Sequence, residues 1–335
     1  MKSSNIGGQA VLEGIMMKNK DRYAVAVRKH DQEIEVDVQE YKSIVPWKAV
    51  SKIPFIRGIS ASWNSLVLGM KTLMYSASFF EDEEVDAKEL TEEEAEKEEK
   101  KERILMNLTV AFSVVLAIGI LCAAIFLSNL VRSYVASHWV LTIVEGVIRV
   151  GIFLAYIALI SRMKDIQRTF MYHGAEHKCI NCIEHGLELN VENVRKSSRQ
   201  HKRCGTSFLF FVMIVSIIFS FFITAESQVL RVLLRIAMLP LIAGVSYEII
   251  RLAGNSDHCL VNFLSKPGLL IQNMTTKEPD DSMIEVAIRA VEAVFDWRAY
   301  ENETFGTQYG EDAEQRKHAE QQENTDAADP KEDEV

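Results

Sequence analysis

Four long apolar runs constrain the fold of this chain more than any other feature of its sequence. They cover roughly residues 104–127, 139–161, 206–225 and 229–252. A helix needs about 20 predominantly apolar residues to cross the hydrocarbon core of a bilayer, and each run is long enough. Buried helices of a soluble protein are the alternative, but such runs exceed what a soluble core usually holds. The runs therefore predict an α-helical membrane protein with about four transmembrane helices, in a membrane domain over residues 104–252.

Lys and Arg residues beside the runs predict how these helices are oriented. Nine of them lie in the segment 162–205, between the second and third runs, whereas the segment after the first run holds only Arg132. Cytoplasmic loops of membrane proteins carry the excess of Lys and Arg. We therefore expect a multi-pass protein in the lipid bilayer, with loop 162–205 and both termini facing the cytoplasm. Any chemistry would then take place at the inner face.

Residues 1–46 predict a small β-rich cytoplasmic unit. Apolar and polar residues alternate over 23–28 and again over 33–38, and a short polar turn separates the two stretches, which is a hairpin pattern. Gly7 and Gly8 precede another short apolar stretch. They could support a phosphate-cradling loop, but without a full Gly-rich pattern and a following helix they favour a tight turn.

Two segments separate this unit from the membrane domain. Residues 47–80 are apolar but interrupted by polar side chains such as Arg57 and Lys71, which predicts an amphipathic helix at the inner leaflet. A fifth, poor span is the alternative, and it would put the N-terminal strands outside. Residues 81–103 are almost all charged and predict a solvated spacer.

Residues 253–300 follow the last run and predict an interfacial segment and a docking helix. Pro267 indicates an interfacial turn. The docking helix is expected to start near Ser282, because Glu285 follows three positions later as in a capping box. Residues 301–335 are rich in Glu, Gln and Asp, which predicts a disordered acidic tail.

Charge and cysteine content narrow the function. The formal net charge is -10, and phosphate contacts need a basic surface, so nucleic acid is not expected as a partner. Four of the five cysteines, all except Cys122, fall in segments expected to be cytoplasmic. Their thiols are therefore expected to be reduced.

The segment His173-Gly174-Ala175-Glu176-His177 carries the clearest chemistry. If the second transmembrane helix continues past the membrane, His173 and His177 lie on one helix face about 6 Å apart, which suits two ligands of one zinc ion. Glu176 lies beside them and could act as the catalytic base, because a bound metal lowers the pKa of water toward 7. The order H-x-x-E-H is the inverted form of the zinc-protease motif.

A catalytic zinc ion needs a third protein ligand. His201 and Cys204 lie at the end of the same loop, just before the third run, and Glu248 lies near the inner end of the fourth. We rank His201 first, Glu248 second and Cys204 third. Glu184 shares the helical face but lies two turns beyond His177, roughly 10 Å too far for the same ion unless the helix breaks.

Two other interpretations stay open for these residues. Cys179 and Cys182, together with His201 and Cys204, have the spacing of a zinc knuckle, which would be a closed structural site without catalysis. Alternatively, the two motif histidines are interfacial residues that are hydrogen-bonded to their neighbours and bind no metal.

Several separate motifs resemble, in the same order, the YqhQ-like family of bacterial membrane proteins. They are Gly7 to Gly14 with Met16 and Met17, Tyr172 to Lys178, Arg203 to Phe208, Tyr247 with Glu248, and Pro267 to Thr276 with Glu278 and Pro279. The resemblance runs from about residue 5 to about residue 298 and omits only the acidic spacer and the tail.

This resemblance implies a location in the bacterial cell membrane and a domain of unknown function that is sometimes described as a predicted metal-dependent enzyme. The family tends to have small or hydroxyl residues where this chain has Cys179 and Cys182, which weakens the zinc-knuckle interpretation. The positions that match the motifs are His173, Glu176, His177, Glu184, His201 and Cys204.

Two functional hypotheses follow. In the first, the chain is a hydrolase-like, metal-dependent enzyme whose zinc ion is held at the cytoplasmic face by the two motif histidines and one of the three ranked candidates. Glu176 would then be its catalytic base. In the second, the chain is a non-catalytic accessory or scaffold subunit of a bacterial membrane complex. A membrane protein partner would then bind its non-membrane segments.

Overall fold

A computed structural model describes most of the chain in five stretches. These are residues 2–43, 53–81, 137–224, 227–256 and 258–309. The first apolar run and, apart from residue 81, the charged spacer lie outside the described residues. The tail beyond residue 309 lies outside them as well.

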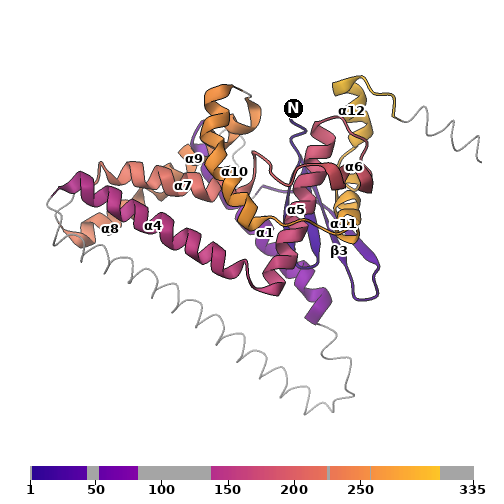
Figure 1. The fold of residues 1–335 in the computed structure, drawn as a ribbon, viewed down its shortest axis with the longest axis horizontal. Coiled ribbons are helices and arrows are strands. Elements are labelled where there is room, and N and C mark those ends of the chain that lie inside the picture. The colour runs from indigo at the N-terminus through magenta and orange to yellow at the C-terminus, as the bar shows by residue number, and fades with distance from the viewer. Residues whose placement is uncertain (1, 44–52, 82–136, 225–226, 257, 310–335) are drawn as a thin grey trace, which may run out of the picture. The chain divides into compact units, whose positions relative to one another are not determined.

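The chain folds into two compact units, and Figure 1 labels their helices and strand β3. Unit 1 comprises Met1–Lys42, Met171–His201 and Thr276–Val335, and unit 2 comprises Ser43–Phe170 and Lys202–Thr275. Each unit is assembled from segments that are distant in the sequence. Its stability therefore depends on contacts that no local pattern reports.

Unit 1 contains an antiparallel sheet of four strands in the order β1-β2-β3-β4. The strands are β1 Gly7–Val11, β2 Gly14–Asn19, β3 Arg22–Arg28 and β4 Ile34–Glu40. β3 and β4 form the predicted hairpin, in which Arg28 pairs with Ile34 next to the turn. The expectation of a small N-terminal β unit is confirmed.

Gly7 and Gly8 do not form the expected tight turn, because they begin strand β1. Position 8 needs a glycine for steric reasons. A Cβ atom there would lie 2.6 Å from the carbonyl oxygen of Met16 and 3.1 Å from the carboxyl carbon of Glu176. Gly8 therefore allows a close approach of other parts of unit 1 to the strand.

Unit 1 also contains helices. They are α5 Lys164–Glu184, which belongs to unit 1 from Met171 onward, α6 Val191–Lys196, α11 Asp281–Glu292 and α12 Trp297–Phe305. α11 packs on β2 and β3, and its apolar side chains, among them Ile284 and Val291, are buried there (Figure 1). The expected docking helix thus exists, and it docks on the sheet of its own unit.

Two details of this C-terminal segment differ from expectation. The N-cap of α11 is Asp280, whose carboxylate accepts the N–H of the third helical residue at 2.9 Å, and Ser282 donates its hydroxyl to the same carboxylate at 2.6 Å. Ordered structure also continues past residue 300: α12 extends to Phe305, and the ring of Tyr309 packs on Trp297 with centroids 5.2 Å apart. The described part of the expected tail, residues 301–309, is therefore folded.

The described residues of unit 2 form helices joined by short connections. The helices that lie wholly within it are α1 Ile56–Glu81, α4 His138–Ile160, α7 Gly205–Ser220, α8 Gln228–Ala237, α9 Leu239–Asn255 and α10 Cys259–Thr275. α9 packs on α1 and α7, and α7 packs on α4 and α10. The expected turn at Pro267 is wrong, because this proline lies inside α10.

Within the described residues, one helix is long and apolar enough to cross a membrane by itself, namely α4 with 23 residues. α8 and α9 meet the same criterion as a pair bent by 42°, so the fourth apolar run forms a broken helix. α7 has 16 residues and is shorter than the third run. The mostly helical architecture is confirmed, while the four-span topology stays a prediction.

Unit 2 exposes apolar residues and buries polar ones. On α4, Val147 is 67 % exposed and Leu159 is 66 % exposed, whereas Thr142 is 5 % exposed. The buried polar residues of its other helices include Ser60, Thr72, Ser76, Ser207, Ser246 and Gln272. Several of their hydroxyls donate to a carbonyl of their own helix, as Ser246 does to Ile242 at 2.7 Å. Polar groups satisfied in this way need no water.

Candidate metal centre

Helix α5 carries the motif histidines and many polar side chains, yet its C-terminal half is buried in unit 1. Every residue from Gly174 to Glu184 is buried. Gly174 permits this burial, because a Cβ atom there would lie 2.0 Å from the carbonyl oxygen of Lys277. Buried polar groups are costly unless they are hydrogen-bonded. The partners of the α5 side chains therefore decide what these side chains do.

Two carboxylates of α5 hold the N-terminal segment of the chain. Glu176 Oε1 accepts the backbone N–H of Gly8 at 3.1 Å. Glu184 Oε1 accepts the backbone N–H and the hydroxyl of Ser4, both at 2.8 Å. Glu176 and Glu184 lie eight residues apart, about 12 Å along the helix, and their partners Gly8 and Ser4 lie four residues apart in the chain. Glu176, the expected catalytic base, thus has one oxygen engaged in this contact.

His177, Lys178 and Asn181 hold segment 195–200 through its backbone carbonyls. Lys178 Nζ donates to two of them at 2.9 Å, Asn181 Nδ2 donates to two at 2.7 and 2.9 Å, and His177 Nδ1 lies 2.7 Å from a fifth. In chain order the acceptors are Arg195, Ser197, Ser198, Arg199 and Gln200. The histidine motif does not reveal Asn181, although its spacing of four residues from His177 puts both on one helical face.

The contact with Arg199 fixes the tautomer of His177. A carbonyl oxygen can only accept a hydrogen bond, so Nδ1 must carry the proton. In the neutral ring Nε2 then keeps the free lone pair that binds a metal. His177 is 1 % exposed, and its ring centroid lies 4.4 Å from that of His173. The two histidines therefore lie side by side, as their spacing predicts.

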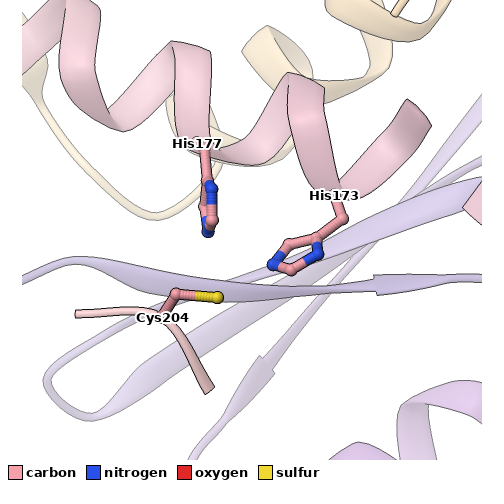
Figure 2. A group of neighbouring side chains, drawn as sticks. All are labelled: His173, His177 and Cys204. Atoms are coloured by element: carbon pink, nitrogen blue, oxygen red, sulfur yellow. The ribbon is translucent and has the colours of Figure 1, made fainter. Parts of the chain in front are cut away.

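Cys204, the third-ranked candidate, completes a group with these histidines. It is the N-cap residue of α7 and follows His201, the last residue of the central segment of unit 1, by three positions. The ligand atoms of His173, His177 and Cys204 all lie within 4.8 Å of one another, and Figure 2 shows both rings and the sulfur gathered around one point. Donor atoms on a tetrahedral zinc ion lie about 3.3–3.6 Å apart, so small rotations would suffice. This cluster could bind a metal ion.

The two higher-ranked candidates have other partners. His201 Nε2 lies 3.3 Å from Oε2 of Glu184, and both side chains are buried. The His201 ring lies 5.8 Å from that of His177, but His201 is outside the 4.8 Å group. Glu248 on α9 is bound by both nitrogens of the Arg57 guanidinium that face it, with Nε at 2.6 Å. In the described part of the chain, the geometry favours Cys204 as the third ligand.

Cys179 and Cys182 do not form the zinc knuckle in this structure. Both lie in the hydrophobic core of unit 1. Burial raises the pKa of the Cys179 thiol well above its usual value, with smaller contributions from Cys182 and Glu176, and burial raises the pKa of Cys182 to about 12. The Cys182 thiol donates to the carbonyls of Leu187 and Glu188. Metals bind the thiolate, so these two protonated thiols are poor ligands.

Residues 53–297 match a family that is described as "Protein of unknown function (DUF1385)". The chain belongs to the DUF1385 family. One relative, the uncharacterized protein YqhQ of Bacillus subtilis (strain 168), is 37 % identical over 292 residues, which cover 85 % of this chain and 90 % of the relative. No solved structure matches the chain.

The DUF1385 region contains the whole cluster, from His173 to Cys204, and begins after the sheet that includes Gly8. Membership confirms the resemblance to the YqhQ-like family. It does not bear on membrane location or on metal dependence. The role of Glu176 as a base likewise stays a prediction.

Proposed function

We propose that this DUF1385 protein is a membrane-embedded, metal-dependent enzyme with hydrolase-like chemistry at the cytoplasmic face of the bacterial cell membrane. One observation carries the proposal. The Arg199 carbonyl binds Nδ1 of His177, which leaves Nε2 as the acceptor beside His173 and Cys204. Metal-binding histidines commonly donate their other N–H to a carbonyl or carboxylate in this way, which orients the ring and raises its basicity.

Zinc suits this set of donors. Imidazole nitrogen and thiolate sulfur are its usual protein ligands, and three protein ligands leave a fourth position open, as in catalytic zinc sites. A bound zinc ion would act as a Lewis acid and lower the pKa of water toward 7. The residues present fit this ion, because two imidazoles and one thiol bring their ligand atoms within 4.8 Å of one another.

Glu176 is the proposed proton acceptor. It is 5 % exposed and directly precedes His177 on α5. The N–H of Gly8 binds its Oε1 and so restricts the orientation of the carboxylate. A general base must lie within hydrogen-bond reach of the proton that it takes, and a fixed carboxylate beside the metal ligands would meet that need.

The membrane location rests on unit 2. In water, its outward apolar side chains would form a surface of a kind that soluble proteins avoid. In lipid, apolar side chains face outward and polar groups have to be satisfied within the protein. α4 combines both features, since Val147 faces outward and the Thr142 hydroxyl donates to the carbonyl of His138 at 2.9 Å.

The chain segments that form unit 1 support an even number of membrane crossings in each half of the membrane domain. Its three chain segments form one compact unit, so they would lie on the same side of a membrane. The chain leaves unit 1 after Lys42 and again after His201, and it returns each time. Residues 43–170 contain the first two apolar runs, and residues 202–275 contain the other two. Each stretch therefore holds an even number of predicted spans. The N-terminus and residues 276–309 would then share the cytoplasmic side.

Metal content of the purified full-length protein tests the proposal. We expect about one zinc ion per chain in the wild type and its loss in His177→Ala and Cys204→Ser. His185→Ala is the matched control, because His185 is an exposed histidine just beyond α5 in the same unit. Wild-type protein without stoichiometric metal would contradict the proposal, as would a His177→Ala variant that keeps it.

Cobalt substitution tests whether the site has an open position. Co(II) in a tetrahedral site with a thiolate ligand gives visible bands and a charge-transfer band, and the latter should vanish in Cys204→Ser. Azide should shift the visible bands if one position is open. Glu176→Gln should retain the metal. A spectrum that azide does not change would instead indicate a closed, structural site.

A non-catalytic accessory or scaffold subunit is the second candidate. It is favoured by the structural use of the motif, because Glu176, His177 and Glu184 all bind backbone groups of other segments of unit 1. In that case the purified wild type would lack metal. A membrane protein would also co-purify with the chain in fixed proportion from detergent-solubilised membranes.

A further inference from the structure

Segment 195–200 presents its backbone carbonyls to α5 across most of its length. α6 ends at Lys196, so the later carbonyls of this segment have no helix of their own to bind them. Buried carbonyls need hydrogen-bond partners, and here the side chains of α5 supply them. The path of this segment is therefore set by α5.

Asn181 holds the part of the segment that matters for His177. Its Nδ2 donates to the carbonyl of Ser198 at 2.7 Å and to that of Gln200 at 2.9 Å. These two residues flank Arg199, whose carbonyl lies 2.7 Å from His177 Nδ1. Asn181 is 4 % exposed, so these bonds are shielded from solvent. One amide group thus clamps the chain on both sides of the carbonyl that contacts the histidine.

Lys178 holds the same segment nearer its start. Its ammonium donates to the carbonyls of Arg195 and Ser197, both at 2.9 Å, and pairs with Glu278 at 2.9 Å. All three of its hydrogens are thereby used, which accounts for a lysine that is only 4 % exposed. Lys178 supports the clamp without touching Arg199.

We infer that Asn181 is a positioning residue of the metal centre. By holding Ser198 and Gln200 it fixes the Arg199 carbonyl, and this carbonyl selects the Nδ1–H tautomer of His177. Neutral imidazole can carry its proton on either nitrogen, and a proton on Nε2 would block the lone pair that a metal needs. The metal itself rests on the proposed function, whereas the choice of tautomer does not depend on it.

The test compares Asn181→Leu with the wild type in the full-length protein. Leucine has a similar size, and it removes both donors without adding a charge. Nitrogen NMR of the metal-free protein at neutral pH reports the tautomer of His177, and zinc titration reports affinity. We expect one Nδ1–H tautomer in the wild type and a mixed or reversed population in the variant. Zinc affinity should fall by about 10–100-fold, as for other residues that orient a metal ligand.

Asn193→Leu is the matched control. Asn193 Nδ2 also donates to a backbone carbonyl, that of Glu188 at 2.9 Å. Asn193 contacts Ser197 through its own backbone carbonyl, which the substitution keeps. This variant should keep the wild-type tautomer and affinity. If Asn181→Leu does not fold, Lys178→Met takes its place, and the tautomer population should move in the same direction by less.

The outcomes separate the inference from the proposed function. An unchanged tautomer in a folded Asn181→Leu overturns the inference, even if zinc affinity falls. A changed tautomer supports it. If the wild type binds no zinc, the proposed function fails, and the NMR result still decides the role of Asn181.

Discussion

Unit 1 and unit 2 treat apolar side chains in opposite ways. Among the described residues of unit 1, the large apolar side chains that are exposed are Val38, Leu187 and Phe305. In unit 2, every helix that lies wholly within it exposes such side chains, as Val147 on α4 and Met74 on α1 illustrate. Among the described residues, large apolar side chains are therefore mostly buried in unit 1 and often exposed in unit 2.

Polar side chains show the same contrast. In unit 1, buried polar groups such as Glu184 and Asn181 bind the backbone of distant segments. In unit 2, buried hydroxyls such as those of Thr72 and Ser246 bind carbonyls of their own helix. Polar groups therefore join the segments of unit 1 together, whereas in unit 2 they are mainly kept away from the outside. The two motif histidines and Glu176 belong to unit 1.

The largest expected effect is a difference in stability between alanine substitutions at two helical glycines. Gly174→Ala should destabilise unit 1 by about 4 kcal/mol, above the usual cost of overpacking, because the new Cβ meets a backbone carbonyl at 2.0 Å. Gly151→Ala on α4 has nothing within 4 Å of the new Cβ and should cost nothing. Thermal unfolding of the two purified variants measures the difference. Equal stability of the two variants would contradict the expected difference between a packed helix and an outward-facing helix.

The second prediction concerns a buried carboxyl group in unit 1. Glu301 on α12 is 0 % exposed, and neither of its oxygens has a hydrogen-bond partner among the described residues. Burial raises its pKa from 4.5 to about 8, and the Glu188 carboxylate adds to the shift. The folded state thus holds a proton that the unfolded state releases above about pH 4.5. This contribution to stability is complete below pH 4.5 and is lost as the pH rises toward 8.

Glu301→Gln should remove this pH dependence. Between pH 5 and pH 8 the wild type should lose about 3 kcal/mol of unfolding free energy that the variant keeps. Thermal midpoints across this range measure the effect. Glu303→Gln, at an exposed position of the same helix, should behave like the wild type. A variant that is as pH-sensitive as the wild type would show that this carboxyl is not buried in its neutral form.

The third prediction tests whether lipid surrounds unit 2. Val147→Lys should disfavour membrane insertion of α4 by roughly 2–3 kcal/mol, because a lysine near the middle of a span is costly. The matched change in unit 1, Leu187→Lys at a site that is 42 % exposed, should have little effect. The membrane-integrated fraction of each variant in cells measures the difference. Normal integration of Val147→Lys would count against a lipid-facing α4.

The smallest expected effect concerns helix caps. Asp280→Ala removes the acceptor for the N–H of Met283 at 2.9 Å and should cost unit 1 about 1 kcal/mol. Ser227→Ala in unit 2 removes a longer contact, 3.5 Å to the N–H of Leu230, and should cost less. Thermal unfolding checks both values. A larger loss for Ser227→Ala would reverse the expected order.

Features with a local cause were predictable from the sequence. The hairpin of β3 and β4 follows from strict alternation, and the helical character of α4 follows from a long apolar run. The pairing of His173 with His177 follows from their spacing on a helix, and their ring centroids do lie 4.4 Å apart. Each of these features depends on residues within one or two turns of the chain.

Features that depend on packing were predicted wrongly or not at all. Pro267 usually ends a helix, but α10 continues through it where Gly268 packs closely on α7, with a Cβ at position 268 only 2.9 Å from the Ser207 hydroxyl. Gly7 and Gly8 resemble a turn, yet they form a strand because β2 and Glu176 lie against them. In both cases a distant partner overrides a local preference.

The choice of the third ligand shows the same limit at the site. The sequence ranks His201 and Glu248 above Cys204. The structure pairs His201 with Glu184 and Glu248 with Arg57, and it brings Cys204 to the two histidines. The path of the loop between them depends on the carbonyls that Lys178 and Asn181 bind. No spacing in the sequence reports those bonds.

The sequence by itself determined where one hairpin and several helices lie, which segments are apolar, and that two histidines share a helical face. The tertiary structure alone decided which buried polar groups serve the fold, which tautomer His177 adopts, and which side chain joins the pair. The reason is that periodicity and capping act over a few residues, whereas the deciding hydrogen bonds join residues as distant as Ser4 and Glu184. Such partners meet only when the chain has folded around them.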